Sequence, residues 1–144
     1  MILDYPNHDE ELQIINLDQT SFPTEKTSQA EILEARKIIR NIYVDEKLKN
    51  YIVSMVQATR NPQLYNKDIA NWLSRGASPR ASLAAMHCAQ AYAWLHGEEY
   101  VVPEHIQAIW HNVLRHRIAL SFEAQADNIS KDSVIDALLR VVAI

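Results

Sequence analysis

The apolar residues of this chain recur with the period of an α-helix over almost its whole length. Only two glycines, Gly76 and Gly97, occur among 144 residues, and no stretch of strict alternation is long enough to predict a strand. Apolar side chains three and four positions apart gather on one face of a helix, which must then be covered. We therefore expect an all-α fold, a small bundle of about five helices.

In the first half of the chain, each segment with a helical apolar pattern is preceded by a residue that can cap a helix. Asn7, with Glu10 three positions later, predicts the first helix, and the capping box Ser28–Glu31 predicts the second. Asp45 caps a third, which ends near Arg60 before a proline. The residues expected on the inner faces of these helices are Leu12, Ile14 and Ile15; then Ile32, Ala35, Ile38, Ile39 and Ile42; then Leu48, Tyr51, Ile52, Met55, Val56 and Thr59.

The second half begins with the most apolar helix that the pattern predicts. Ser78 and Pro79 mark its start and Gly97 its end, and its composition predicts the central, most buried element. Only a narrow stripe breaks its apolar surface, formed by Arg80, His87, Gln90 and Trp94. Further helices are expected from Pro103 and over 130–142. Residues 18–27 read as a loop, 61–75 as a connection with a short helical turn, and 116–129 as an irregular loop or a short strand pair.

Composition excludes several classes of protein. The formal charge of −4 gives no general attraction to nucleic acid, and no apolar run reaches the roughly 18 residues that a membrane span requires. Cys88 is the only cysteine, so neither an internal disulfide nor a cysteine-rich zinc site is expected. The acidic first residues lack the pattern of a signal peptide, which favours a cytoplasmic protein.

The motifs of catalysis are also missing. Two isolated glycines cannot form the phosphate-binding loop G-x-x-x-x-G-K-[ST] or the G-x-G-x-x-G dinucleotide loop, and no G-x-S-x-G elbow or H-E-x-x-H zinc motif occurs. Asp45 and Glu46 follow an apolar run, as magnesium-binding carboxylates do in ATPases, but Asp45 is better explained as a helix cap. We expect no catalytic residue and no metal site in this chain.

Arg80 is the candidate binding residue. It falls in the first turn of its helix, where a cation opposes the helix dipole at a cost of a few tenths to about 1 kcal/mol. A bound phosphate would reverse this penalty, since helix N-termini attract anions. The plainer alternative is a solvated surface arginine. Arg117 lies in a second basic cluster, which could contact a phosphate or a partner chain, or could simply complement a helix C-terminus.

Four blocks in this order resemble the C-terminal helical lid of the MoxR family of AAA+ ATPases. They are Arg60 within ATR, GASPRAS at 76–82, EEYVVPEHIQ at 98–107 and VLRHRIALSFEA at 113–124. Tyr5-Pro6 followed by acidic residues is similar to the family's junction between core and lid. The resemblance implies a single AAA+ lid domain over 1–144, with 1–17 as the junction from a nucleotide-binding core that this sequence lacks.

The same resemblance implies a role for Arg80 as the sensor 2 arginine, which reaches the γ-phosphate of ATP, with Ser78 and Arg117 as possible supporting residues. The parent protein would hydrolyse ATP with Mg²⁺ in a ring, expected to be hexameric. It would act as a chaperone, with von Willebrand factor A domain proteins as possible partners, and Met1 would begin an excised piece. Two departures stand out: Val102 replaces a capping threonine, and 61–75 is longer than usual.

Two alternatives remain open at the level of sequence. The first is a standalone helical interaction module in which Arg80 is merely solvated. The second is a helical nucleic-acid binder using Arg75, Arg80, Arg115 and Arg117, which the net charge disfavours.

Overall fold

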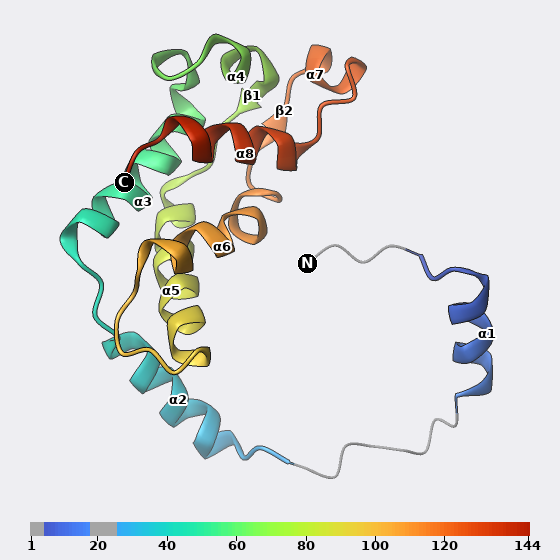
Figure 1. Cartoon of the computed structure of the whole chain (residues 1–144), viewed down its shortest axis with the longest axis vertical. Helices are drawn as coiled ribbons and strands as arrows, with labels where there is room; N and C mark the ends of the chain where they lie inside the picture. The colour runs from blue at the N-terminus through green and yellow to red at the C-terminus, as the bar shows by residue number, and fades with distance from the viewer. Residues whose placement is uncertain (1–4, 18–25) are drawn as a thin grey trace. The chain divides into compact units, whose positions relative to one another are not determined.

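The computed structural model describes residues 5–17 and 26–144, which fall into two compact units, residues 1–35 and residues 36–144. Figure 1 labels the elements of both units. The prediction of a single lid domain with 1–17 as its junction stays a prediction. In chain order the elements are α1 (His8–Asn16), α2 (Gln29–Asn41), α3 (Glu46–Arg60), the 3-10 helix η1 (Pro62–Leu64), α4 (Lys67–Trp72), β1 (Leu73–Arg75), α5 (Pro79–Leu95), α6 (Pro103–Leu114), β2 (Ala119–Leu120), α7 (Phe122–Ala126) and α8 (Lys131–Val141).

Helix α1 begins where the sequence predicts. The Asn7 side chain accepts hydrogen bonds from the Asp9 and Glu10 amides, both at 3.0 Å, and the Asn7 amide donates to Glu10 Oε2 at 2.8 Å. The expected inner face of α1 is wrong, however, because the helix buries no residue. The side chains in question, Leu12, Ile14 and Ile15, are all exposed.

Helix α2 follows the capping box formed by Ser28 and Glu31. The Ser28 amide donates to Glu31 Oε2 at 2.6 Å, and this bond, with one from the Ser28 hydroxyl, lowers the pKa of Glu31. The predicted burial of α2 is only partly confirmed: Ile42, directly after the helix, is buried in the core, and Ala35 and Ile39 are half-buried. Within the helix no residue is fully buried, and Ile32 and Ile38 are exposed. An amphipathic pattern shows which face is apolar, but it does not show that the same chain covers that face.

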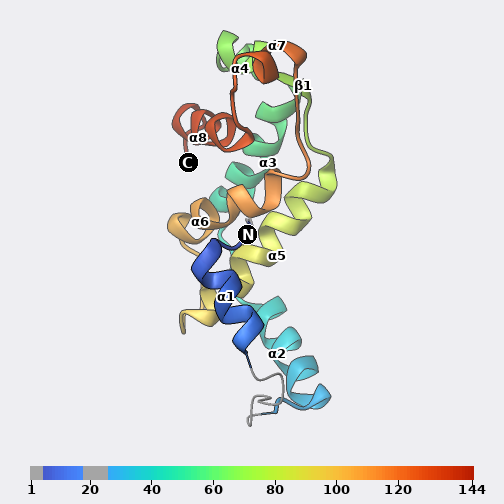
Figure 2. The same cartoon turned by 90° about the vertical axis from the view of Figure 1, so that its right-hand side faces the viewer.

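The core of the unit 36–144 lies among α3, α5, α6 and α8. Helix α3 starts at the Asp45 cap and buries every residue predicted for its inner face, together with Ala58. Helix α5 packs most extensively on α6, as Figure 2 shows from the side, and α8 lies across α3 and α6. Large side chains at these contacts, such as Trp110, Met55 and Leu138, are fully buried.

Helix α5 is central, but only one side of it is buried. This side is a row of alanines spaced by four residues, Ala81, Ala85, Ala89 and Ala93, each with no exposed surface. The prediction that apolar residues are buried around most of its circumference is wrong, because Leu83 is 58% exposed. Alanine side chains are short, so the buried side of α5 can lie close to the helices that pack on it, while a larger side chain such as Leu83 remains outside.

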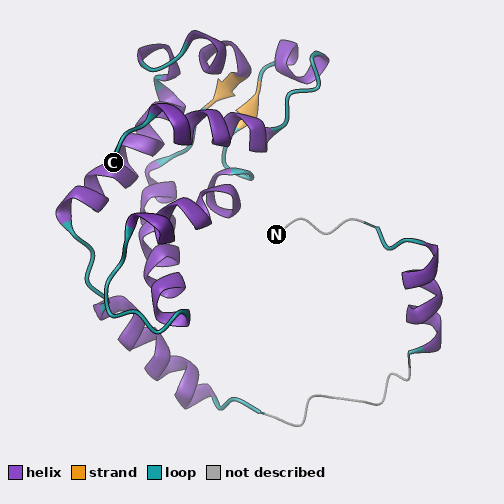
Figure 3. Ribbon diagram, in the orientation of Figure 1, coloured by secondary structure: helices purple, strands orange, loops and turns teal. Residues whose placement is uncertain are grey.

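A short antiparallel sheet joins the segment between α4 and α5 to the segment between α6 and α7. Leu73 in β1 pairs with Leu120 in β2, and Arg75 pairs with Ala119, with an irregularity between them (Figure 3). The Ser74 hydroxyl donates to the Leu120 carbonyl at 2.9 Å. The sequence predicted a possible strand pair within 116–129; β2 does lie there, but its partner strand comes from 73–75. The two strands are more than forty residues apart in the chain, so no local sequence pattern predicts that they pair.

The last helices confirm the sequence pattern. Helix α6 follows Val102, which has no side chain that can cap; instead the Val102 amide donates to the His105 ring at 3.3 Å. Helix α8 is capped by Ser130, whose hydroxyl accepts from the Ser133 amide at 3.0 Å. Among the described residues the fold is thus mostly helical, with more helices than the five expected. The loop predicted at 18–27 lies mostly outside the described residues.

Candidate functional site

Arg80 lies in the first turn of α5, and its side chain is exposed. Its guanidinium makes no hydrogen bond or ion pair with any residue that the structure describes. The first turn of α5 contains no acidic residue, so no carboxylate within it offsets the positive end of the helix dipole. The combination of an unpaired guanidinium with a helix N-terminus is suited to a multiply charged anion such as a phosphate.

Ser78 occupies the N-cap position of α5 without capping it. Its backbone is extended, as an N-cap requires, but its hydroxyl makes no capping hydrogen bond. The Ala81 amide instead donates to the Ser78 carbonyl at 2.8 Å. The Ser78 hydroxyl, two positions from Arg80, is therefore not committed to the helix start.

The segment just before α5 is fixed to the end of α3 by two hydrogen bonds. The Ala77 amide donates to Thr59 Oγ1 at 2.9 Å, and Arg60 Nε donates to the Ala77 carbonyl at 2.6 Å. Thr59 is only 1% exposed and its hydroxyl donates to the Val56 carbonyl at 2.6 Å. The N–H and C=O groups of Ala77 are thus both held by consecutive residues of α3. These bonds fix the position at which α5, with Arg80 in its first turn, begins.

Gly76 completes this attachment by its lack of a side chain. A Cβ at this position would lie 2.2 Å from the Thr59 carbonyl oxygen and 2.8 Å from the Arg60 amide nitrogen. The backbones of the two segments therefore touch, and only glycine allows that approach. The sequence pointed to Arg80 and to the motif around it, but the role of Thr59 and Gly76 in anchoring it required the tertiary structure.

The other arginines named from the sequence are placed differently. Arg117 donates to the Val113 carbonyl at 2.6 Å and contacts His116, so it serves the end of α6. Arg115 forms a two-pronged ion pair with Asp132, with distances of 2.8 and 3.1 Å, and these hydrogen bonds lower the pKa of Asp132. Arg75 is exposed in β1. No hydrogen bond or ion pair among described residues links Arg117 to Arg80.

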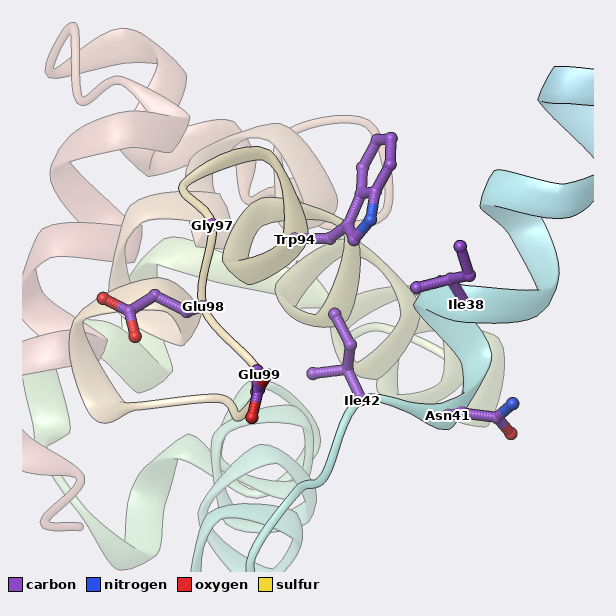
Figure 4. A pocket seen from close by; sticks show the side chains of 7 residues that line it. All are labelled: Ile38, Asn41, Ile42, Trp94, Gly97, Glu98 and Glu99. Carbon is purple, nitrogen blue, oxygen red and sulfur yellow. The ribbon is translucent and has the colours of Figure 1, made fainter.

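A separate opening of about 470 Å³ lies at the other end of α5 (Figure 4). Trp94 faces the end of α2 across it, and Glu98 and Glu99 border it on the loop that follows α5. Trp94 is fourteen residues from Arg80, about 21 Å along a helix axis. This opening is therefore not part of the Arg80 site.

In the part of the chain that the structure describes, no group of three or more histidine, cysteine or acidic side chains is close enough to hold a metal ion. None of the helices in this part combines the length and the apolar character needed to cross a membrane.

The chain is similar in sequence to several known proteins. Residues 68–138 match the family model of the AAA lid domain. The chain is 38% identical over 143 residues to the chaperone MoxR1 of Mycobacterium tuberculosis, a match that covers 97% of this chain and 38% of MoxR1. It is 32% identical over 145 residues to the uncharacterized protein YeaC of Bacillus subtilis, covering 97% of this chain and 42% of YeaC.

The fold is also similar to that of a solved structure. The crystal structure of a proposed ATPase from Cytophaga hutchinsonii superposes with a TM-score of 0.87 at 33% identity, over 99% of this chain and 44% of that one. The chain thus spans less than half the length of these relatives. The matched residues include the α4 to α8 region that carries Arg80 and the β1–β2 pair. The chain belongs to the AAA lid domain family and is a lid of the kind found in MoxR-type AAA+ ATPases.

Proposed function

We propose that this lid contributes Arg80 to ATP held by a nucleotide-binding core outside the present sequence. The supporting observation is the unpaired, exposed guanidinium on a helix start that Thr59, Arg60 and Gly76 fix in place. A guanidinium hydrogen bond to a phosphate contributes about 1.5 to 3 kcal/mol, which exceeds the cost of a cation at a helix N-terminus. Anchoring matters because the start of α5 is fixed to α3, so a ligand that pulls on Arg80 would move the helix and the rest of the domain with it.

In the parent protein ATP and Mg²⁺ would be bound by that core, since this chain has no phosphate-binding loop. Hydrolysis would change what Arg80 contacts, and the lid would move as a unit because α5 is its central helix. We propose that this movement passes to the next subunit of an oligomeric ring, expected to be hexameric. Ser78 and Arg117 are proposed as supporting residues, with Ser78 the nearer of the two in the chain.

The wider role is proposed from the relatives. One of them is named a chaperone, which supports a chaperone-like ATPase that remodels protein complexes. We propose the cytoplasm as its location. We propose a protein with a von Willebrand factor A domain as a partner of the parent protein.

The test is ATP turnover by the longer protein, with the sequence that precedes this chain in its gene, as wild type and as Arg80→Ala. We expect turnover at saturating ATP to fall at least tenfold, because a contact to the transferred phosphate is lost. Arg75→Ala, also exposed and close in sequence, is the matched control and should keep wild-type turnover. Unchanged turnover in Arg80→Ala would refute the role of Arg80.

The second candidate is a standalone interaction module, which the exposed apolar residues of α1 and α2 favour. The exposed fraction lies between 47% and 76% for four of them, Leu12, Ile15, Ile32 and Leu33. This alternative takes precedence if the gene encodes no phosphate-binding loop before this chain.

A further inference from the structure

A second surface of the lid is cationic and is not used by the proposed ATP contact. It is a pocket of about 250 Å³ between the last turns of α2 and the middle of α5, entirely within the unit 36–144. Its lining residues are Arg36, Ile39, Arg40, His87, Gln90 and Ala91.

The rim of this pocket carries unpaired positive charge. Arg36 and Arg40 are four residues apart, so they lie one turn from each other on the same face of α2. Both side chains are exposed, and neither makes a hydrogen bond or ion pair with another described residue. No acidic residue is among the lining residues, although the whole chain carries a net charge of −4. The pocket is therefore positively charged although the chain as a whole is negatively charged.

The floor of the pocket is apolar and fixed. Ile39 and Ala91 are half-buried there. Gln90 is only 6% exposed, and its amide NH₂ donates to the Ile42 carbonyl at 2.9 Å and to the Arg40 carbonyl at 3.4 Å. These bonds hold the end of α2 against α5, so the backbone that carries the two arginines is fixed beside the floor.

We propose that this pocket binds a glutamate side chain in an acidic segment of a partner protein. The carboxylate would lie between Arg36 and Arg40, whose planar guanidinium groups suit bidentate contact with two oxygens. The methylenes of the glutamate would rest on Ile39 and Ala91. A phosphate fits less well because it has no methylene groups to cover the apolar surface of Ile39 and Ala91.

This proposal does not depend on the proposed function of Arg80. His87 is seven residues from Arg80 on α5, about 10 Å along the helix axis. The pocket and the Arg80 site can therefore be altered separately.

The test is a titration of the ¹⁵N-labelled 144-residue chain with hexaglutamate at low ionic strength, followed through the Nε–Hε signals of the arginines. We expect the signals of Arg36 and Arg40 to shift, and the double variant Arg36→Gln/Arg40→Gln to bind at least tenfold more weakly. Arg140→Gln, which removes one exposed cation from the last turn of α8, is the control and should bind as wild type does. The amide spectrum of each variant reports whether it is folded.

Three outcomes would overturn the proposal. Equal affinity in the folded double variant would place the bound peptide elsewhere. Loss of binding in Arg80→Gln, with no loss in the double variant, would assign the anion to the start of α5. Displacement of hexaglutamate by an equal or lower concentration of inorganic phosphate would make the pocket a phosphate site.

Discussion

At the scale of single residues, Gly76 has little freedom to change. Its Cα passes so close to the last turn of α3 that a methyl group would lie 2.2 Å from the Thr59 carbonyl oxygen, a backbone atom that cannot rotate away. We expect Gly76→Ala to lower the free energy of unfolding by about 2 kcal/mol or more, since steric overlap within a packed region is among the costly kinds of substitution. Urea denaturation followed by circular dichroism measures this loss.

Gly97 provides the matched control for that substitution. Its φ of +76° disfavours a side chain, but nothing lies within 4 Å of the added methyl group. Gly97→Ala should therefore cost only about 1 kcal/mol, the price of a left-handed conformation. A smaller loss in Gly76→Ala than in Gly97→Ala would contradict the close approach of the two backbones.

At the scale of elements, the Arg115–Asp132 pair ties the end of α6 to the first turn of α8. The pair lowers the pKa of Asp132, so its contribution to stability is present above the ordinary pKa of an aspartate, about 4, and is lost as the pH falls through the lower folded pKa. Both side chains are partly exposed to solvent, which limits this contribution to about 1 kcal/mol.

The variant Asp132→Asn tests this pair. We expect it to unfold at lower urea than wild type at pH 7, with the difference shrinking as the pH falls through the lowered pKa of the wild-type carboxyl. Asp127→Asn, which changes an exposed aspartate after α7, should show no such pH-dependent difference. A destabilisation of Asp132→Asn that does not decrease as the pH is lowered below about 4 would show that the charge is not its cause.

At the scale of the whole molecule, the 144-residue chain should fold without turning over ATP. It has no phosphate-binding loop, and a single arginine at a helix start gives little affinity for a nucleotide without a core. We expect at most millimolar affinity for ADP or ATP and no measurable hydrolysis. Titration calorimetry with each nucleotide checks this, and micromolar binding by the isolated chain would contradict it.

Local sequence determined much of this fold. The Asn7, Asp45 and Ser130 caps each accept a hydrogen bond from the first turn of a helix, and the seven-residue inner face of α3 includes all six side chains predicted for it. Such features depend on residues three or four positions apart, which the sequence shows directly. The motif around Arg80 and the family were likewise visible in the sequence.

Only the tertiary structure decided which apolar faces are covered and what holds Arg80. The apolar stripe of α2 and the buried one of α3 look alike in sequence, but α3 lies against other helices of this chain and α2 buries no residue. The β1–β2 pairing and the attachment of Gly76 and Ala77 to Thr59 join segments that are distant along the chain. These contacts depend on how whole helices pack, and packing is set by the combined shape of many side chains rather than by any local spacing.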